Sequence, residues 1–393
     1  MSPSTQKAVY FYISEFLLLV LTISCYFGDI IGANNFKYSI FALSLVAIFF
    51  SYPTLKTQQF LQHLKIIVLP WVPWVLGTVI LMFVHGTKDL TQYLNAVLLV
   101  ILIFSSLYCF NMRRKTILLA FAFCLTAFDI AIAVYILKNG ATTNIIGANR
   151  NELFAVLTFI NVGLASHFLL SIDSGNHDRF ECLFLGFTIL FTLAVTVMSE
   201  VRNAILAYGS CAGVFLLFGN KNNRKYCLFF GLIFIVLIAL SFATGRMQSG
   251  IQDIQQLEAG NSYTSWGLRI EMWKMVLRGF PLAPLFGWGS DAPNAMLSAG
   301  VTFPLDWEIA HFHNDFLIAL ATGGIVLAVA WSVSMVYLFS NSIKDLTRTC
   351  VLTSILSTGL VERNMFEQDM LFPFVIFWTL LCVTDQSLKA KFK

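Results

Sequence analysis

YCLFFGLIFIVLIALSFA, residues 226–243, is a run of 18 residues without a charged side chain. A helix needs about 20 mostly apolar residues to cross the hydrocarbon layer of a membrane. Further runs of this kind lie on both sides of it, and the chain is predicted to cross a membrane twelve times. The predicted spans cover roughly 11–31, 36–52, 64–84, 91–110, 117–136, 152–172, 181–198, 203–219, 226–243, 315–340, 348–361 and 370–385.

The composition of the whole chain supports this interpretation. Of 393 residues, 58% are hydrophobic and only 12% are charged, whereas soluble domains have about 25% charged residues. So few charges cannot cover the surface of a soluble domain, which excludes a soluble enzyme, a nucleic-acid-binding protein and a disordered scaffold. We expect an all-α, polytopic integral membrane bundle of about twelve helices, in contact with membrane lipids and with no nucleic acid partner.

The positions of Lys and Arg orient the predicted spans. With the N-terminus inside, fifteen of these residues fall on the inner side and six in the short outer loops. Because basic residues accumulate in cytoplasmic loops, both termini are predicted to be cytoplasmic. Three regions follow: spans one to nine (1–243), a long outer loop (244–314) and spans ten to twelve (315–393). The N-terminus has no signal-peptide pattern, so we expect the first span to be retained.

Several common kinds of site are not indicated by the sequence. The eight cysteines are scattered singly and form no CxxC pair, which argues against a disulfide framework or a thiolate metal site. There is no P-loop and no GxGxxG motif following a strand. We therefore expect no nucleotide and no cofactor.

Three arginines lie at the outer ends of predicted spans or in the outer loop, against the general trend of the charges. They are Arg150 in GANRN, Arg202 in SEVRN and Arg269 in the long loop. Arginine suits phosphate because its planar fork donates two parallel hydrogen bonds and keeps its proton. The alternative for each is a side chain that reaches the headgroups or a local ion pair, such as Arg202 with Glu200.

The long outer loop contains a predicted helix over residues 265–280. One apolar stripe on it consists of Trp266, Ile270, Trp273, Leu277 and Phe280. Such a helix is expected to lie in the membrane interface with its tryptophans at headgroup depth. Arg269 at the edge of the stripe would then lie at the height of a lipid-linked phosphate. The alternative is a helix that only covers the bundle.

HFHND, residues 311–315, precedes the tenth span and contains two histidines. A histidine at the water boundary is a candidate general base, since its unperturbed pKa is about 6.5. In a helix, His311 and His313 would point about 200° apart, and in an extended segment they would share a face. A zinc site would need a third ligand, for which Asp306, Glu308 and Asp315 are available. HxH is a weak metal signal, and we expect no metal.

Two acidic residues fall inside predicted spans. Asp129 in the fifth span and Glu15 in the first could each be half of a proton or ion pathway. Asp129 lies in the outer half of its span, where pairing with an outer arginine is the simpler explanation. Glu15 lies near the inner end and is expected to reach water.

Four motifs together resemble the bacterial O-antigen ligase and polymerase superfamily. They are an Arg and a Trp on a loop helix, a P-L-x-G-x-G turn, an H-N pair and a following G-I. In this chain they read GLRIEMW (267–273), PLFGWG (284–289), HFHNDFL (311–317) and TGGI (322–325). The resemblance is specific over about 265–330, and the twelve-span layout extends it loosely over the whole chain.

The resemblance implies a glycosyltransferase, independent of metal and nucleotide, at the periplasmic face of the bacterial inner membrane. The donor would be O-polysaccharide on undecaprenyl diphosphate, and the acceptor a sugar hydroxyl of lipid A–core. His313 would be the general base. Arg150 and Arg202 resemble family arginines and, with Arg269, would hold the diphosphate and offset charge on the leaving group. His311, Asn314 and Asp315 are expected to support the site.

The chemistry is coherent without the family. An activated diphosphate needs only orientation, charge stabilisation and a base for the hydroxyl, and direct displacement would invert the anomeric centre. The prediction is an O-antigen ligase, and the absence of a large periplasmic domain after span twelve favours it over protein-glycosylating relatives. The alternatives are an O-antigen polymerase with a different acceptor and a transporter of lipid-linked sugars. A transporter should have charged or polar residues on both faces and through its core, whereas here the core charges are nearly absent and the polar cluster is one-sided.

Overall fold

Apolar helices make up most of the part of the chain that the structure, a computed structural model, describes. The described residues are 67–86, 114–141, 144–146, 148–173, 178–199, 201–306, 308–309, 311–366 and 368–383. Their elements, in order, are η2 (Leu69–Trp71), α4 (Val72–His85), α6 (Arg114–Asn139), β1 (Asn144–Ile145), β2 (Ala148–Asn149), α7 (Arg150–Asp173), α8 (Arg179–Met198), α9 (Asn203–Phe218), α10 (Tyr226–Ala243), α11 (Arg246–Glu258), α12 (Ser265–Gly279), η3 (Phe280–Leu282), α13 (Ala292–Ser298), α14 (Asp315–Ser342), α15 (Leu346–Gly359) and α16 (Gln368–Val383).

Helices occupy the predicted spans wherever the structure describes them. Within the described residues, five helices are long and apolar enough to cross a membrane, namely α6, α7, α8, α10 and α14. Shorter apolar helices occupy the other predicted spans there, in α4, α9 and α16, and in the less apolar α15. The spans predicted over 11–31, 36–52 and 91–110 lie outside the described residues, as does Glu15. The chain is a helical membrane protein, and the number of twelve spans stays a prediction.

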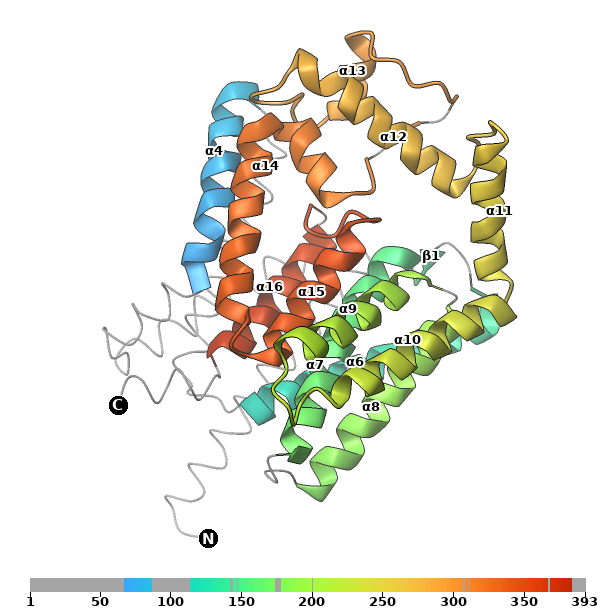
Figure 1. Cartoon of the computed structure of the whole chain (residues 1–393), viewed down its shortest axis with the longest axis vertical. Helices are drawn as coiled ribbons and strands as arrows, with labels where there is room; N and C mark the ends of the chain where they lie inside the picture. The colour runs from blue at the N-terminus through green and yellow to red at the C-terminus, as the bar shows by residue number, and fades with distance from the viewer. Residues whose placement is uncertain are drawn as a thin grey trace.

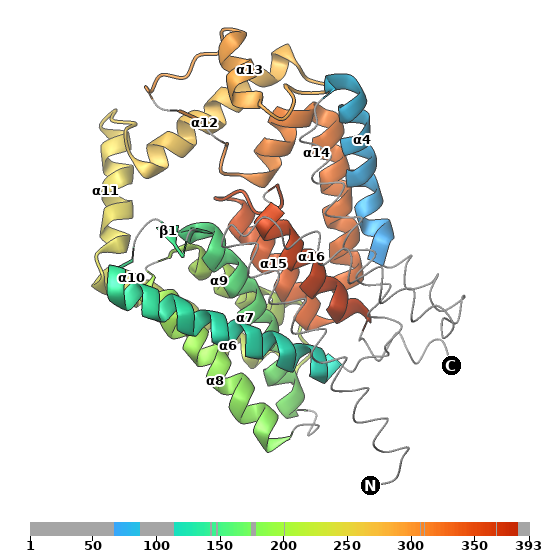
Figure 2. The same cartoon turned by 180° about the vertical axis from the view of Figure 1, so that it is seen from behind.

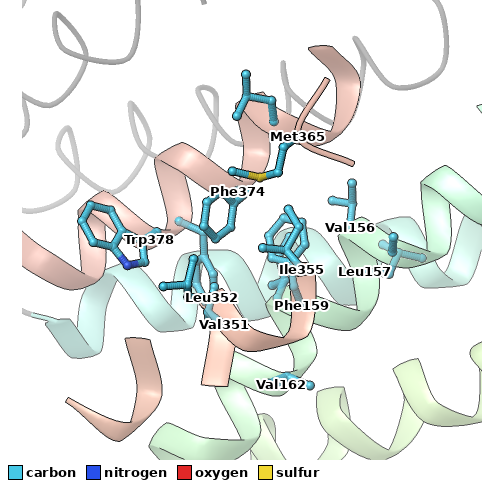
Figure 3. Close-up of a cluster of buried hydrophobic side chains, with 14 of the residues drawn as sticks. Val156, Leu157, Phe159, Val162, Val351, Leu352, Ile355, Met365, Phe374 and Trp378 are labelled. Atoms are coloured by element: carbon cyan, nitrogen blue, oxygen red, sulfur yellow. The ribbon is translucent and has the colours of Figure 1, made fainter. Parts of the chain in front are cut away.

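The centre of the bundle is the packing of α15 against α7, α9 and α16. Figure 3 shows Phe159 of α7, Ile355 of α15 and Phe374 of α16 gathered in one buried cluster. A Cβ atom on Gly163 of α7 would collide with the Phe377 ring, so α7 and α16 approach closely there. This core therefore holds α15, which ends at the connection to α16.

Two peripheral contacts complete the frame. On one side α4 packs against α14, and the Trp74 amide donates to Ser334 Oγ at 3.1 Å. On the other side α10 packs mainly on α9 and leaves apolar side chains such as Leu228 and Leu232 exposed. Apolar exposure of this kind suits a helix in contact with lipid.

A buried polar contact joins α6 to α8. Asp129 is fully buried, and its Oδ2 accepts a hydrogen bond from Thr192 Oγ1 at 2.5 Å. Thr192 also donates to the Thr188 carbonyl of its own helix. The hydrogen-bond partner of Asp129 is thus a threonine of α8.

The segment between α10 and α14 forms an arch beside the bundle (Figures 1 and 2). It rises through α11, crosses in α12 and reaches α13 near the ends of α4 and α14. The helix predicted over 265–280 is confirmed as α12, whereas α11 and α13 were not expected. The periplasmic position of this segment stays a prediction.

Two apolar faces are present on α12 where the sequence indicated one. The buried face consists of Met272, Met275 and Val276, which pack into the protein. The stripe with Trp266 stays half-buried, and its Leu277 is 60% exposed. The protein core therefore binds the methionine face, and the tryptophan-bearing stripe is partly exposed, while the position of this helix in the membrane interface stays a prediction.

Candidate functional site

One carboxylate joins segments that are far apart in the sequence. Glu362, in the connection between α15 and α16, accepts from His313 Nδ1 through Oε2 at 3.0 Å and from Arg269 Nη2 through Oε1 at 2.8 Å. The same Oε1 accepts from Asn151 Nδ2 at 3.1 Å. The carboxylate is almost fully buried, and the start of α7, the α12 arch and the entry to α14 meet on it.

The imidazole of His313 is held in one orientation by this contact. A carboxylate only accepts hydrogen bonds, so the proton of the neutral ring is on Nδ1 and the lone pair is on Nε2. The His313 side chain is 23% exposed, compared with 5% for Glu362. This arrangement, a base oriented by a buried carboxylate, can take a proton from a hydroxyl group.

His311 lies directly against His313. The two ring centroids are 4.1 Å apart, with the planes tilted by 54°. Burial lowers the pKa of His311 to about 3, and the neighbouring His313, Arg363 and Arg269 act in the same direction. His311 is therefore neutral near pH 7 and adds no second positive charge beside the base.

The backbone of residues 311–313 is neither helical nor a regular strand. His313 has φ +48°, the left-handed region that non-glycine residues rarely adopt, and Trp273 Nε1 of α12 donates to the Phe312 carbonyl at 2.9 Å. The sequence left open whether the rings of His311 and His313 point apart, as in a helix, or share a face, as in an extended segment. In the structure the two rings share a side. Among the described residues, no group of three His, Cys, Asp or Glu side chains is arranged to hold a metal ion.

Arg269 projects from the first turns of α12. Thr264 begins this helix, since its Oγ1 accepts from the Gly267 amide at 3.0 Å. Arg269 Nη1 donates to Ser265 Oγ at 2.9 Å, and its guanidinium lies 5.8 Å from the Trp266 ring centroid. The side chain is 13% exposed. Its contact with Trp266 places the guanidinium at the edge of the tryptophan stripe, as predicted.

Arg150 and Arg202 each precede an asparagine that belongs to the same polar chain. Asn203 Nδ2, in the first turn of α9, donates to the Asn151 carbonyl at 3.4 Å, and Asn151 in turn bonds Glu362. The arginine side chains have contacts of their own. Arg150 Nη1 donates to the Ala141 carbonyl at 3.2 Å. The structure thus brings the two arginine-bearing segments together at Glu362.

Arg202 also contacts the arch. A Cβ atom on Gly250 of α11 would lie 2.6 Å from Arg202 Nη1. Glycine at this position therefore lets α11 pass close to the guanidinium. The alternative partner considered above, Glu200, lies outside the described residues.

Asn314 and Asp315 form the start of α14. Asn314 Oδ1 accepts from the Leu317 amide at 3.0 Å and caps the helix, while Asn314 Nδ2 donates to the Leu360 carbonyl at 2.9 Å. Asp315 is buried, and its Oδ1 accepts from the Met365 amide at 3.0 Å. Both residues therefore contact the connection that bears Glu362.

The two glycine-containing motifs hold one another. The PLFGWG turn (284–289) donates from the Trp288 and Gly289 amides to the carbonyls of residues 321 and 322 in α14, at 2.8 and 2.9 Å. α14 is broken at Gly324, whose φ of +59° suits glycine. The break frees the amide of Ile325, which donates to the Pro284 carbonyl at 2.8 Å. These motifs are structural, because they join the arch to α14 just beyond the histidines.

The sequence analysis missed two members of the site, Glu362 and Asn151. Glu362 stands in VERN after a short span, and nothing in its spacing relates it to His313, 49 residues earlier. Asn151 follows Arg150 directly in the N-R-N motif, which was examined only for its arginine. The signal that could have identified Glu362 was a carboxylate next to an arginine, Arg363, at the outer end of a predicted span.

Comparison with known proteins gives three similarities. A model of the O-antigen ligase family matches residues 187–332, which include Arg202, Arg269 and His313. An O-antigen ligase of Escherichia coli (strain K12) is 21% identical over 352 residues, covering 83% of this chain and 82% of that protein. An uncharacterized protein of Haemophilus influenzae (strain ATCC 51907 / DSM 11121 / KW20 / Rd) is 23% identical over 336 residues, covering 79% and 81%.

Proposed function

The chain belongs to the O-antigen ligase superfamily, and on this premise we propose that it is an O-antigen ligase. The family indicates a glycosyltransferase of the ligase or polymerase type. The proposed reaction transfers O-polysaccharide from undecaprenyl diphosphate to a sugar hydroxyl of lipid A–core at the periplasmic face of the inner membrane. The observation that carries the proposal is the Glu362 carboxylate, which joins the candidate base His313 to the candidate phosphate ligand Arg269.

His313 is the proposed general base. Its Nδ1 is occupied by Glu362, so Nε2 takes the proton of the acceptor hydroxyl. The imidazolium that forms is stabilised by the Glu362 carboxylate, as in other base–carboxylate pairs.

The arginines are the proposed ligands of the diphosphate. The Arg269 guanidinium has five donors, of which Nη2 contacts Glu362 and Nη1 contacts Ser265. Positive charge at this place offsets the negative charge that grows on the leaving group, an effect worth roughly 10²–10³-fold in rate per donor. Arg202 and Arg150 are assigned to the same diphosphate because their segments meet at Asn151.

The step balances without another reactant. The acceptor oxygen forms a bond to the anomeric carbon while its proton passes to His313 Nε2. The bond between the anomeric carbon and the phosphate oxygen breaks, and undecaprenyl diphosphate leaves with the electron pair. Direct attack from the side opposite the diphosphate inverts the anomeric centre, so we expect an inverting enzyme.

The proposed periplasmic location rests on the distribution of charges. With both termini in the cytoplasm, the arch and the starts of α7, α9 and α14 lie on the outer side. A long-chain glycan on a lipid carrier and lipid A–core are both accessible there. Activity is proposed to need no nucleotide, since the diphosphate carrier already activates the sugar.

The experiment that tests this proposal is a lipopolysaccharide gel from a strain without the gene. A ligase predicts core without O-polysaccharide, together with long glycan that accumulates on undecaprenyl diphosphate. Core that carries a single repeat unit would instead identify a polymerase. An unchanged ladder would contradict both, and a lipid-linked sugar transporter would then be tested by the side of the membrane on which the donor accumulates.

A further inference from the structure

The Glu362 segment, residues 360–365, has no regular structure of its own to hold its carboxylate. It follows the last turn of α15, where the amides of Val361 and Glu362 share the Thr358 carbonyl at 3.1 Å each. Asn364 Nδ2 donates to the Ile355 carbonyl at 3.1 Å. These bonds fix the segment to α15, but they do not fix it relative to His313.

The residue after His313 holds one end of the Glu362 segment. Asn314 uses its amide oxygen to cap α14 and its amide nitrogen to bind the Leu360 carbonyl at 2.9 Å. One side chain therefore has two separate tasks. The first starts the helix, and the second positions the carbonyl that lies two residues before Glu362.

The next residue holds the other end. Asp315 is 2% exposed, and its Oδ1 accepts from the Met365 amide at 3.0 Å, three residues after Glu362. Its Oδ2 lies where the Cβ of any larger residue would stand at position 359, so Gly359 leaves room for the carboxyl group. A buried carboxylate is costly without hydrogen bonds, and the backbone of the Glu362 segment supplies one.

We propose that Asn314 and Asp315 are positioning residues, which fix the Glu362 carboxylate against His313 by holding the two ends of the segment that carries it. Because the three residues are consecutive, the base and both holding side chains move as one rigid unit at the start of α14. The distance between His313 and Glu362 then depends on two short side-chain contacts. This inference rests on the proposed function and assigns a role to residues that do not touch the substrate.

The test uses variants that separate the two tasks of Asn314 and that remove or keep the hydrogen-bond acceptor of Asp315. Asn314→Ser keeps a helix-capping oxygen but loses the donor to Leu360. Asp315→Ala removes the acceptor for Met365, whereas Asp315→Asn keeps it. Asp178→Ala is the matched control, because Asp178 caps α8 through the Phe180 amide elsewhere in the chain.

The first measurement is transfer by the purified full-length protein in lipid nanodiscs. We expect Asp315→Ala and Asn314→Ser to lower kcat roughly 10- to 100-fold with KM nearly unchanged, since small misplacement of a catalytic group has effects of this size. Asp315→Asn should retain most of the kcat, and Asp178→Ala all of it. In a Glu362→Gln background Asp315→Ala should change kcat less than about 3-fold. Both changes remove the same interaction, that of the Glu362 carboxylate with His313, and it can be lost only once. Additive losses would overturn the proposal.

The second measurement, amide hydrogen exchange over residues 360–366, does not depend on activity. Exchange should be faster in Asp315→Ala and Asn314→Ser than in the parent protein, and unchanged in Asp315→Asn and Asp178→Ala. Unchanged exchange in both of the first two variants would refute the positioning role whatever their kcat. If exchange changes as expected while the parent protein transfers no glycan, the positioning role stands and the proposed function fails.

Discussion

A carboxylate with two basic partners lies at each end of α15. Asp345 precedes the helix and Glu362 follows it. Both carboxylates are nearly fully buried, with 9% and 5% of the side chain exposed. The two clusters therefore share their helix and the burial of their carboxylate, and they differ in the partners that surround it.

The cluster around Asp345 is built from groups that do not change their charge. Arg114 binds Asp345 in a forked manner, at 2.6 and 3.2 Å, and Arg348 Nε lies 3.3 Å from Oδ2. Burial raises the pKa of Asp345, but the two guanidiniums outweigh it and lower the pKa to about 2. The Asp345 carboxylate stays ionised over the physiological range, and the cluster joins α6 to α15.

The cluster around Glu362 replaces one arginine with an imidazole. An imidazole can accept and release a proton during catalysis, which a guanidinium cannot do. The His313 side chain is 23% exposed, compared with 19% for Arg114 and 3% for Arg348 in the other cluster. A buried carboxylate with two basic partners is structural when both partners are permanently charged guanidiniums, and suited to catalysis when one partner is an imidazole.

The strongest expected effect on activity is that of His313→Ala. Removal of a general base costs roughly 10²–10⁴-fold in rate, so transfer to lipid A–core should be undetectable on a gel. The variant should still be present in the membrane in normal amount. His311→Ala is the matched comparison and should be much milder, because a neutral ring in van der Waals contact supplies packing only. Normal activity of His313→Ala would exclude this residue as the base.

Arg269→Lys should have the next largest effect. Lysine keeps the charge but cannot donate to Glu362 and a phosphate oxygen with the geometry of a fork, and loss of such a donor costs roughly 10²-fold or more in kcat. Arg278→Lys, on the same helix and 42% exposed, is the control that should be unaffected. Equal activity of the two variants in a transfer assay would remove Arg269 from the diphosphate site.

Glu362→Gln should lower kcat less, by roughly 10- to 100-fold, because the amide can still accept a hydrogen bond but no longer stabilises an imidazolium. The buried Glu271, which pairs with Lys274 at 2.6 Å on α12, offers a matched control as Glu271→Gln. Measurement of kcat for both variants tests whether the position of the carboxylate or only its burial matters. A larger loss in Glu271→Gln would contradict the assignment.

The apolar helices that the structure describes were predictable because each depends on a local pattern. The uncharged run 226–243 has the same bounds as α10, and the stripe over 265–280 correctly indicated α12. α11 was missed because its sequence, RMQSGIQDIQQLE, is too polar for a span, and its contacts with α10 and α12 come from the fold. Local apolar patterns predict spans well and predict short helices of a connecting segment poorly.

The site was predictable in part. His313 and Arg269 stand out because their residue types suit the chemistry and their positions are unusual. Glu362 does not stand out, since its role exists only through contacts with residues 49 and 93 positions away in the chain. Such a pairing depends on how α15 packs against α7 and α9, which no spacing in one sequence records.

The smallest expected effect on activity is that of Asp345→Asn, which should leave kcat unchanged and lower stability. Removal of one partner from a buried ion cluster costs roughly 2–4 kcal/mol. Because the folded-state pKa of Asp345 is depressed to about 2, its stabilisation is present above pH about 4 and is lost as the pH falls toward 2. Thermal unfolding of the parent protein and the variant should therefore differ at pH 7 and converge in acid.

Asp173→Asn is the matched control for this prediction, since Asp173 pairs with Lys225 at 2.6 Å but in an exposed position. Exposed ion pairs contribute little to stability, so this variant should unfold like the parent protein. A loss of kcat in Asp345→Asn as large as that in Glu362→Gln would show that the Asp345 cluster takes part in the reaction. The contrast between the two ends of α15 would then fail, because permanent charge would no longer separate the structural cluster from the catalytic one.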